Sequence, residues 1–165
     1  MIELKEITYE NFVDVLKLRV EKDQEDFVAS NSYSLAEAYC SLKESPIPDT
    51  PLAIVHEEEV VGFLMYEYCG IQRDDGEDDD EYLQETPYYH LFRYMVDKKH
   101  QGKGYGRLAM ERLIEHIKTK PQGEADGFFI CYCPENGVAK KFYESFGFVD
   151  TGQVIDDENI MRLAI

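Results

Sequence analysis

The stretch that decides the fold of this chain runs from Tyr89 to Arg107 and reads YHLFRYMVDKKHQGKGYGR. Its first part, up to Val96, is rich in aromatic and aliphatic residues, which favours a β-strand. Glycines then alternate with other residues, and an amphipathic helix follows that ends before Pro121, with Ala109, Met110, Leu113, Ile114 and Ile117 on one side. A strand, a glycine-rich turn and a helix in this order predict one βαβ crossover.

The glycine-rich turn suits an anion. Gly102, Gly104 and Gly106 lack Cβ atoms, so successive main-chain N–H groups can turn inward, and the helix N-terminus adds about half a positive charge. Such a turn can hold a phosphate or pyrophosphate. The spacing differs from a P-loop and from a dinucleotide fingerprint, which needs glycine where Arg107 stands. The alternative is a turn that only reverses the chain. Further positive charge comes from Lys98, Lys99, Lys103 and Arg107.

The residues before this stretch predict two helices and a hairpin. Thr8 can cap a helix that reaches about Lys22, and Ser34-Leu35-Ala36-Glu37 forms a capping box that opens a second helix to about Leu42. Two runs rich in apolar, β-branched and aromatic residues, Leu52–His56 and Val60–Tyr68, then predict an antiparallel hairpin.

The residues after it predict a strand over Phe128–Cys133, a helix over Gly137–Phe146 that ends at Gly147, and a last strand over Asn159–Ile165. This order of elements is typical of an α/β (α+β) fold with an antiparallel start. We expect a single domain over residues 1–165, because that length makes about one domain.

The charge is strongly acidic and unevenly distributed. The chain has 34 acidic and 17 basic side chains, for a net charge of −17, so we expect no nucleic-acid or membrane partner. Residues 1–87 hold 23 acids and 6 bases, whereas residues 88–165 hold 11 of each. The acidic run at 74–81 accounts for only part of this bias, and we expect it to form a solvated loop of undetermined role. The N-terminal half therefore suits a cation, and the other half tolerates an anion.

No metal site and no export signal are expected. The closest cysteine pair, Cys131 and Cys133, has neither a second pair nor a nearby histidine to complete a zinc set, so we expect reduced cysteines. The N-terminus lacks a basic segment followed by an apolar run, and we expect a cytoplasmic protein.

Two motifs carry a family resemblance. The pattern Gln101-x-x-Gly104-x-Gly106, preceded by Tyr94-Met95-Val96, resembles the acetyl-CoA pyrophosphate motif of the GNAT superfamily of N-acetyltransferases. A second segment, residues 136–148, has the family's order of an Asn, an Ala, a helical Tyr and a Gly-Phe pair. The order of the elements agrees along nearly the whole chain. The sequences of residues 23–31 and 101–106 are most similar to those of bacterial spermine/spermidine acetyltransferases.

The resemblance implies a mixed, mostly antiparallel sheet in which two neighbouring strands splay apart at the acetyl-CoA site. It implies that Met95 and Val96 bind the pantetheine and acetyl group through their main chain. Asn136 either contacts the same arm or only caps a helix. The remaining residues that the resemblance assigns to acetyl-CoA are those of the pyrophosphate turn: Gln101, Gly102, Lys103, Gly104, Tyr105, Gly106 and Arg107.

Tyr143 matches the family's general acid, which protonates the departing thiolate. Core packing is the alternative for this residue. A base must also remove a proton from the acceptor amine, and Glu25, Glu67 and the acids of the 74–81 loop are candidates for contact with the substrate. Some polyamine acetyltransferases of the superfamily carry acids where this chain has Phe92-Arg93, so their amine-binding residues cannot be transferred.

The resulting hypothesis is an acetyl-CoA-dependent N-acetyltransferase that acts on a small-molecule amine, a polyamine such as spermidine, spermine or a diamine. Two alternatives remain. The acceptor can be another amine, namely a protein N-terminus, a lysine side chain, an amino acid or an aminoglycoside, or the domain can be a non-catalytic acyl-CoA sensor. By analogy with the family, a homodimer is expected.

Overall fold

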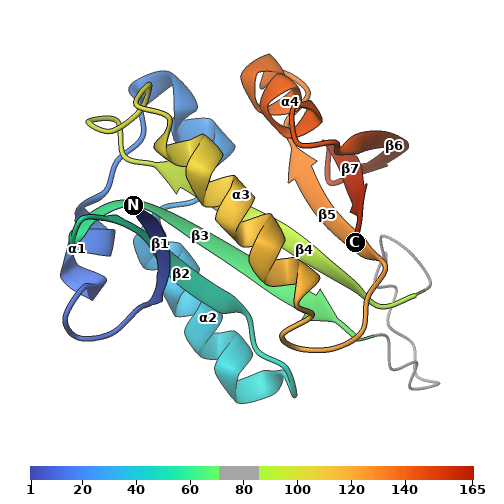
Figure 1. Ribbon diagram of the computed structural model, residues 1–165, viewed down its shortest axis with the longest axis horizontal. Helices are drawn as coiled ribbons and strands as arrows, with labels where there is room; N and C mark the ends of the chain where they lie inside the picture. The colour runs from blue at the N-terminus through green and yellow to red at the C-terminus, as the bar shows by residue number, and fades with distance from the viewer. Residues whose placement is uncertain (71–85) are drawn as a thin grey trace.

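One seven-stranded sheet, in the order β1-β2-β3-β4-β5-β7-β6, forms the centre of the computed structural model, which describes residues 1–70 and 86–165 (Figure 1). Neighbouring strands are antiparallel except β4 and β5, which are parallel, so the mixed, mostly antiparallel sheet is confirmed. The predicted acidic loop at 74–81 lies outside the described residues. The strands are β1 (Ile2–Glu6), β2 (Thr50–His56), β3 (Glu59–Cys69), β4 (Tyr88–Val96), β5 (Gly127–Tyr132), β6 (Val149–Ile155) and β7 (Glu158–Ala164).

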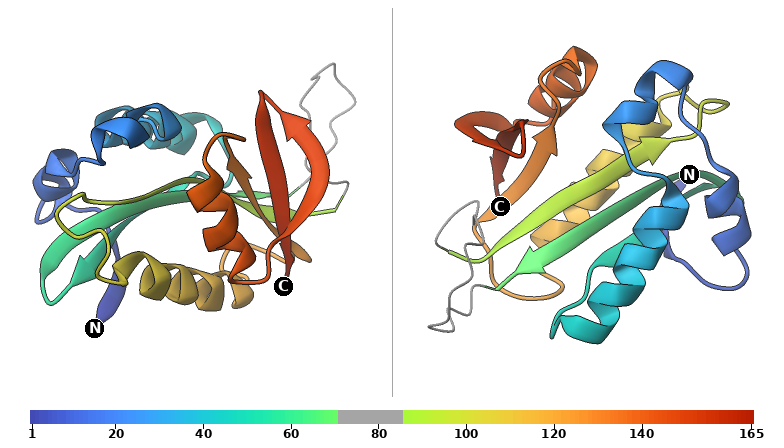
Figure 2. Two further views of the ribbon diagram at one scale, coloured as in Figure 1. Left: turned by 90° about the horizontal axis from the view of Figure 1, so that it is seen from above. Right: turned by 180° about the vertical axis from the view of Figure 1, so that it is seen from behind.

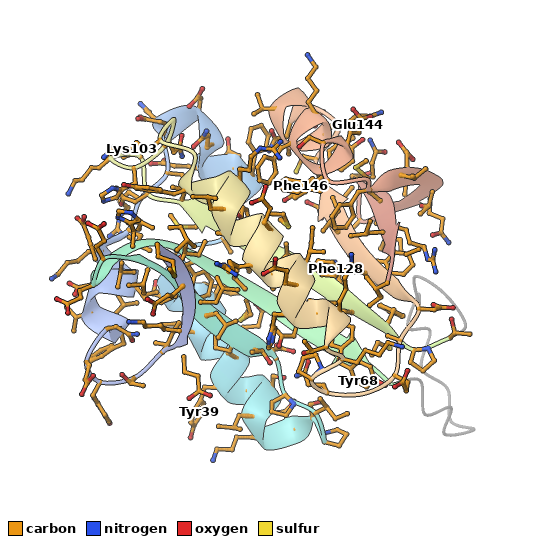
Figure 3. All side chains as sticks on the ribbon, in the orientation of Figure 1. Tyr39, Tyr68, Lys103, Phe128, Glu144 and Phe146 are labelled. Atoms are coloured by element: carbon orange, nitrogen blue, oxygen red, sulfur yellow. The ribbon has the colours of Figure 1, made fainter. Side chains whose placement is uncertain are left out.

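Helices cover both faces of the sheet (Figure 2). The apolar side of α3 packs on one face, where it shares an apolar cluster with Phe128 of β5 (Figure 3). The first two α-helices cover the other face through a second apolar cluster that contains Val15 and Phe63. The helices are α1 (Phe12–Lys17), the 3-10 helix η1 (Lys22–Phe27), α2 (Asn31–Glu44), α3 (Tyr105–Lys118) and α4 (Gly137–Glu144).

The predicted helix over Thr8–Lys22 is wrong at both ends, because α1 begins at Phe12 with Asn11, not Thr8, as its N-cap and ends at Lys17. The chain leaves the helix at Leu18, which is extended, and η1 begins only at Lys22. Contacts to a distant loop explain the break. The N–H of Arg19 donates to the buried Asp97 carboxylate (2.9 Å), and the carbonyl of Arg19 accepts from the N–H of Lys98 (2.8 Å). These bonds take the Arg19 main chain away from the helix.

The capping box at Ser34 is also wrong. Helix α2 begins three residues earlier, and its cap is Ser30, whose side chain accepts from the N–H of Tyr33 (3.3 Å). Ser34 is fully buried, and its hydroxyl accepts from Nε of Arg93 on β4 (3.2 Å). Ser34 therefore lies inside the helix, where its hydroxyl makes a tertiary contact, and the spacing to Glu37 only resembles a capping box.

Two strands were missed by the sequence analysis. Strand β1 is only five residues long and pairs with β2 at the edge of the sheet. In β6 every residue except Ile155 is exposed, so the strand lacks the apolar alternation that predicts one. The hairpin of β2 and β3, strands β4, β5 and β7, and helices α3 and α4 are confirmed with shifts of one or two residues at their ends.

The sheet opens between β4 and β5, as Figure 1 shows. Among the described residues their parallel pairing runs from Tyr88 to Leu91 and stops there. Opposite β3, the register shifts between Leu91 and Arg93, which makes Phe92 the extra residue of a β-bulge. A bulge bends its strand, and β5 meanwhile stays paired with β7. The two strands therefore diverge beyond the bulge, which confirms the expected splay.

Replacement of Gly62 by alanine tests how tightly β3 holds the bent strand. A Cβ at this position would lie 2.5 Å from the carbonyl oxygen of Met95, a contact with main chain that cannot rotate away. We expect Gly62→Ala to lower the free energy of unfolding by about 1–3 kcal/mol, measured by urea denaturation. Gly137→Ala is the control, because a Cβ there meets nothing within 4 Å. Equal urea midpoints for the two variants would contradict the close approach.

Candidate functional site

A groove with a volume of about 920 Å³ lies where β4 and β5 separate. Six parts of the chain line it: η1, the bulged end of β4, the glycine-rich turn before α3, the end of β5, α4, and Glu158 at the start of β7. The open sheet therefore creates a cavity between elements that are far apart in the sequence.

The glycine-rich turn presents a row of available main-chain donors. Gly102 and Gly104 have φ angles of +75° and +82°, a region that favours glycine, and Gly104 is the N-cap of α3. Within the described residues, the N–H groups from Gly102 through Arg107 donate to no protein acceptor; the next N–H, that of Leu108, bonds to the carbonyl of Gly104 (3.2 Å). Most residues of the turn line the groove. The turn can thus hold an anion at the positive end of α3.

Buried polar contacts fix this turn in place. Asp97 accepts from the N–H of Lys99 (2.9 Å) through its side chain, and its carbonyl accepts from the N–H of His100 and of Gln101. The Gln101 side chain donates to the Val96 carbonyl (3.0 Å) and to Oε1 of Gln24 in η1 (2.7 Å). Gln101 therefore anchors the turn to β4 and to η1.

Val96 and Met95 face different directions. The N–H of Asp97 donates to the Val61 carbonyl on β3 (2.9 Å). Because main-chain groups alternate along an antiparallel strand, the N–H and carbonyl of Val96 point away from β3, toward the gap, whereas those of Met95 point to β3. Both residues line the groove, but only Val96 offers its main-chain N–H to it.

Tyr94 and Arg107 tie α3 to its neighbours. The Tyr94 hydroxyl donates to the Gly106 carbonyl in the first turn of α3, and burial raises the pKa of that phenol. The Arg107 guanidinium donates to Oγ of Ser145 (2.7 Å) and lies over the Phe146 ring, 4.7 Å from its centroid. Arg107 thus connects the turn to the end of α4 rather than being held free for a ligand.

Helix α4 positions Tyr143 in the groove. The side chain of Asn136 caps this helix by accepting from the N–H of Ala139 (3.0 Å), and Asn136 also lines the groove. Tyr143 is buried and lines the groove, and its hydroxyl makes no hydrogen bond to the part of the chain that the structure describes. Burial, followed by the nearby Cys131 and Glu158, raises the pKa of Tyr143. The phenol therefore stays protonated and can act as a proton donor.

A chain of three side chains crosses β3, β4 and β5 beside the groove. Glu67 and His90 are cross-strand partners, and Oε1 of Glu67 lies 2.8 Å from Nδ1 of His90. Nε2 of His90 lies 3.2 Å from Sγ of Cys131. His90 and Cys131 line the groove. The sequence analysis missed this arrangement, because strand register, which the sequence does not reveal, brings these residues together.

Acidic side chains surround the rest of the groove. Glu25 is exposed in η1, and Glu158 lies on β7, where it accepts from the Cys133 thiol (3.4 Å). Arg93, a basic residue in this part of the groove, pairs with Glu37 of α2 (3.0 Å). The predicted split of charge between the two halves of the chain is therefore only partial in space. Five acids line the groove, and two of them come from the C-terminal half: Asp23, Glu25, Asp26, Glu135 and Glu158.

The described residues contain no group of three or more His, Cys, Asp or Glu side chains that could hold a metal ion. All four cysteines are free, and none forms a disulfide. In the same part of the chain, no helix combines the length and the apolar character that crossing a bilayer requires.

Comparison with known proteins gives a family match. The model of the Acetyltransferase (GNAT) family matches residues 12–148, which span α1 to the end of α4 and include the glycine-rich turn and Tyr143. Two relatives from Bacillus subtilis are each 26% identical over 161 residues, which cover 97% of this chain and 96% of theirs. They are the spermine/spermidine N(1)-acetyltransferase of strain 168 and the probable spermine N(1)-acetyltransferase of subsp. natto strain BEST195.

Solved structures share the fold. The PaiA N-acetyltransferase from Thermoplasma acidophilum, in complex with coenzyme A, aligns with a TM-score of 0.67 at 14% identity, over 100% of this chain and 99% of that one. The aminoglycoside acetyltransferase AAC(6′)-Ib, also in complex with coenzyme A, aligns with a TM-score of 0.73 at 17% identity, over 99% and 95% of the two chains.

Proposed function

This chain belongs to the acetyltransferase (GNAT) family, and from that premise we propose that it transfers an acetyl group from acetyl-CoA to a primary amine of a small polyamine. One observation carries the proposal. Within the described residues, a groove between splayed strands has a row of main-chain donors without a protein acceptor at one part and carboxylates without an ion-pair partner at another. Such a groove suits an anionic acyl donor together with a cationic acceptor. The two Bacillus relatives, which act on spermine or spermidine by name, support the acceptor class.

The residues of the turn fit the diphosphate of acetyl-CoA. Their N–H groups from Gly102 to Arg107 are available, and Gly102 and Gly104 have open space where a Cβ would stand. The N–H of Val96, at the gap, supplies a donor for the negative charge that develops on the acetyl oxygen during attack. Acetyl-CoA supplies the activated acetyl thioester, and the protein binds and orients it.

Tyr143 is the general acid in this proposal. Its hydroxyl lies at the groove without a competing partner in the described chain, and its raised pKa keeps the proton in place until a thiolate forms. A thiolate that departs into the same buried surroundings becomes more basic, since burial disfavours its charge. This reduces the uphill cost of a transfer from phenol to sulfur.

The acidic lining captures the acceptor. A polyamine carries several ammonium groups, and the carboxylates of Glu25, Glu135 and Glu158 line the same groove without an ion-pair partner among the described residues. Attraction of this kind raises the local concentration of a cation and weakens as salt increases. A non-catalytic sensor would need neither these acids nor Tyr143.

Substitution at Gly104 tests the anion site. We expect Gly104→Ala to weaken coenzyme A binding at least about tenfold, measured by isothermal titration calorimetry, because the left-handed φ is strained for alanine and a change of backbone turns the donors away. Gly152→Ala is a matched control. Gly152 has φ of +78° and open space around its Cβ position, but it lies on β6 and does not line the groove. Equal loss of affinity in both variants would reject the assignment.

Substitution at Tyr143 tests the acid. We expect Tyr143→Phe to lower kcat by roughly 10²-fold or more, while coenzyme A affinity and thermal stability stay near those of the parent, since the hydroxyl makes no hydrogen bond in the described chain. Stopped-flow thiol detection and calorimetry measure the two quantities. Parent-like turnover in the variant would remove Tyr143 from the mechanism.

Thiol release from acetyl-CoA tests the acceptor class. We expect spermidine and spermine to exceed glycine, a peptide N-terminus and an aminoglycoside in kcat/KM. The value for spermidine should fall as sodium chloride rises, and the value for a monoamine should fall less, because fewer charges are screened. Preference for a peptide or an aminoglycoside, or a spermidine value that is independent of salt, counts against the polyamine proposal.

A further inference from the structure

We propose that His90, held by Glu67, is the base that takes the proton from the acceptor ammonium. This inference rests on the proposed acetyltransferase function and adds a catalytic residue to it. An alkyl amine has a pKa of about 10 and is protonated near neutral pH, so it cannot attack until a group at the groove removes that proton. Imidazole is the side chain that accepts protons most readily in this range.

Hydrogen bonds orient the His90 ring for this task. A carboxylate only accepts hydrogen bonds, so the 2.8 Å contact with Oε1 of Glu67 places the hydrogen of the neutral ring on Nδ1. Nε2 then carries the free electron pair. That nitrogen faces Cys131 at 3.2 Å, and both residues line the groove, whereas Glu67 stands behind the ring on β3. Glu67 is therefore a positioning residue, and Nε2 is the atom that receives the proton.

Cys131 is not a nucleophile in this arrangement, although a Cys-His-Glu series invites that interpretation. Burial, together with the acidic residues nearby, raises the pKa of the Cys131 thiol to about 12, so the sulfur keeps its hydrogen. A thiol is a weak hydrogen-bond donor, and an ammonium group forms stronger, charge-assisted bonds. An ammonium that enters the groove therefore replaces the thiol as the donor to Nε2.

Titratable and charged side chains lie around His90. Glu67 and Cys131 contact its ring, and Tyr143 and Glu158 lie near Cys131. The one cation of this group, Arg93, is paired with Glu37. The side chains are Glu67 on β3, Arg93 on β4, Cys131 on β5, Tyr143 on α4 and Glu158 on β7.

The protons balance as follows. One proton moves from the ammonium nitrogen to Nε2 of His90 and leaves to solvent through the groove. The neutral amine then forms the C–N bond to the acetyl carbon, and the C–S bond breaks. The departing sulfur takes the proton of Tyr143, and the second proton of the nitrogen restores the phenol. The sum is one amide, one thiol and one released proton.

The experiment compares three variants in the full-length protein. We expect His90→Gln to lower kcat/KM for spermidine by roughly 10²-fold near neutral pH, with a deficit that shrinks as pH rises and the free amine accumulates. With a β,β-difluorinated diamine whose reacting nitrogen is already neutral at the assay pH, the variant should approach the wild type. Glu67→Gln should move the acid limb of the pH profile. His116→Gln, which removes an imidazole bonded to Tyr66 outside the groove, is the control.

Readouts other than turnover complete the test. Coenzyme A affinity by calorimetry should be the same in wild type and His90→Gln, and the histidine C2–H resonance assigned to His90 should titrate differently in Glu67→Gln. Intact-mass spectrometry of the wild type with acetyl-CoA should find no acetyl adduct.

Three results would overturn the assignment. They are an unchanged pH profile in His90→Gln, a loss in that variant that persists with the pre-deprotonated acceptor, and an acetyl adduct on Cys131. Failure of the polyamine proposal looks different. In that case the wild type prefers another amine, and the His90 comparison is run with that amine. A wild type that releases no thiol with any amine overturns both proposals.

Discussion

The site depends on main-chain donors that the protein leaves without an acceptor. A sheet normally uses its N–H groups in strand pairing, but β4 loses β5 beyond Leu91, and within the described residues the N–H groups from Gly102 to Arg107 have no protein acceptor. Solvent can satisfy these groups, and so can one diphosphate, which accepts several bonds at once. The fold can keep such a segment rigid because Asp97 and Gln101 bind its base to β4 and η1. The contacts beneath the turn thus hold its N–H groups in position for an anion.

The opening between β4 and β5 also connects the two faces of the sheet. Tyr143 belongs to the apolar cluster on the side of α3, whereas Cys131 packs in a separate cluster, and Phe92, beside His90, lies on the side of the first helices. In the proposed mechanism, a donor bound along one face and an acceptor from the other meet within the sheet. The proposed acid and base then lie in different surroundings: a buried phenol on one side and an imidazole bonded to a carboxylate on the other.

Local signals in the sequence predicted most of the fold, and long-range contacts explain the errors. The glycine-rich turn, the amphipathic α3 and the cap at Asn136 are local patterns, and all three are present. The N-terminal helix broke at Arg19 because Asp97 and Lys98, far along the chain, bind its main chain. Gln101 lines the groove and its side chain donates to Val96 and Gln24, while its predicted contact with acetyl-CoA stays a prediction. The Glu67–His90 pair depends on register across two strands, which no pattern within either strand encodes.

Arg93 has a structural role on β4, three residues after the proposed base His90. Arg93 follows the bulge and donates hydrogen bonds to Ser34 and Glu37, so it anchors α2 to β4. Some polyamine acetyltransferases of the superfamily carry an acid in this part of the strand. An acid at this position would lose both contacts and would place its carboxylate beside that of Glu37. Two like charges so close together destabilise the folded state when they are partly buried. After the bulge, β4 therefore contributes contacts that hold α2 in place. In the proposed mechanism proton transfer is assigned to His90, two residues before Phe92, where β4 still pairs with β3 and Glu67 contacts the ring.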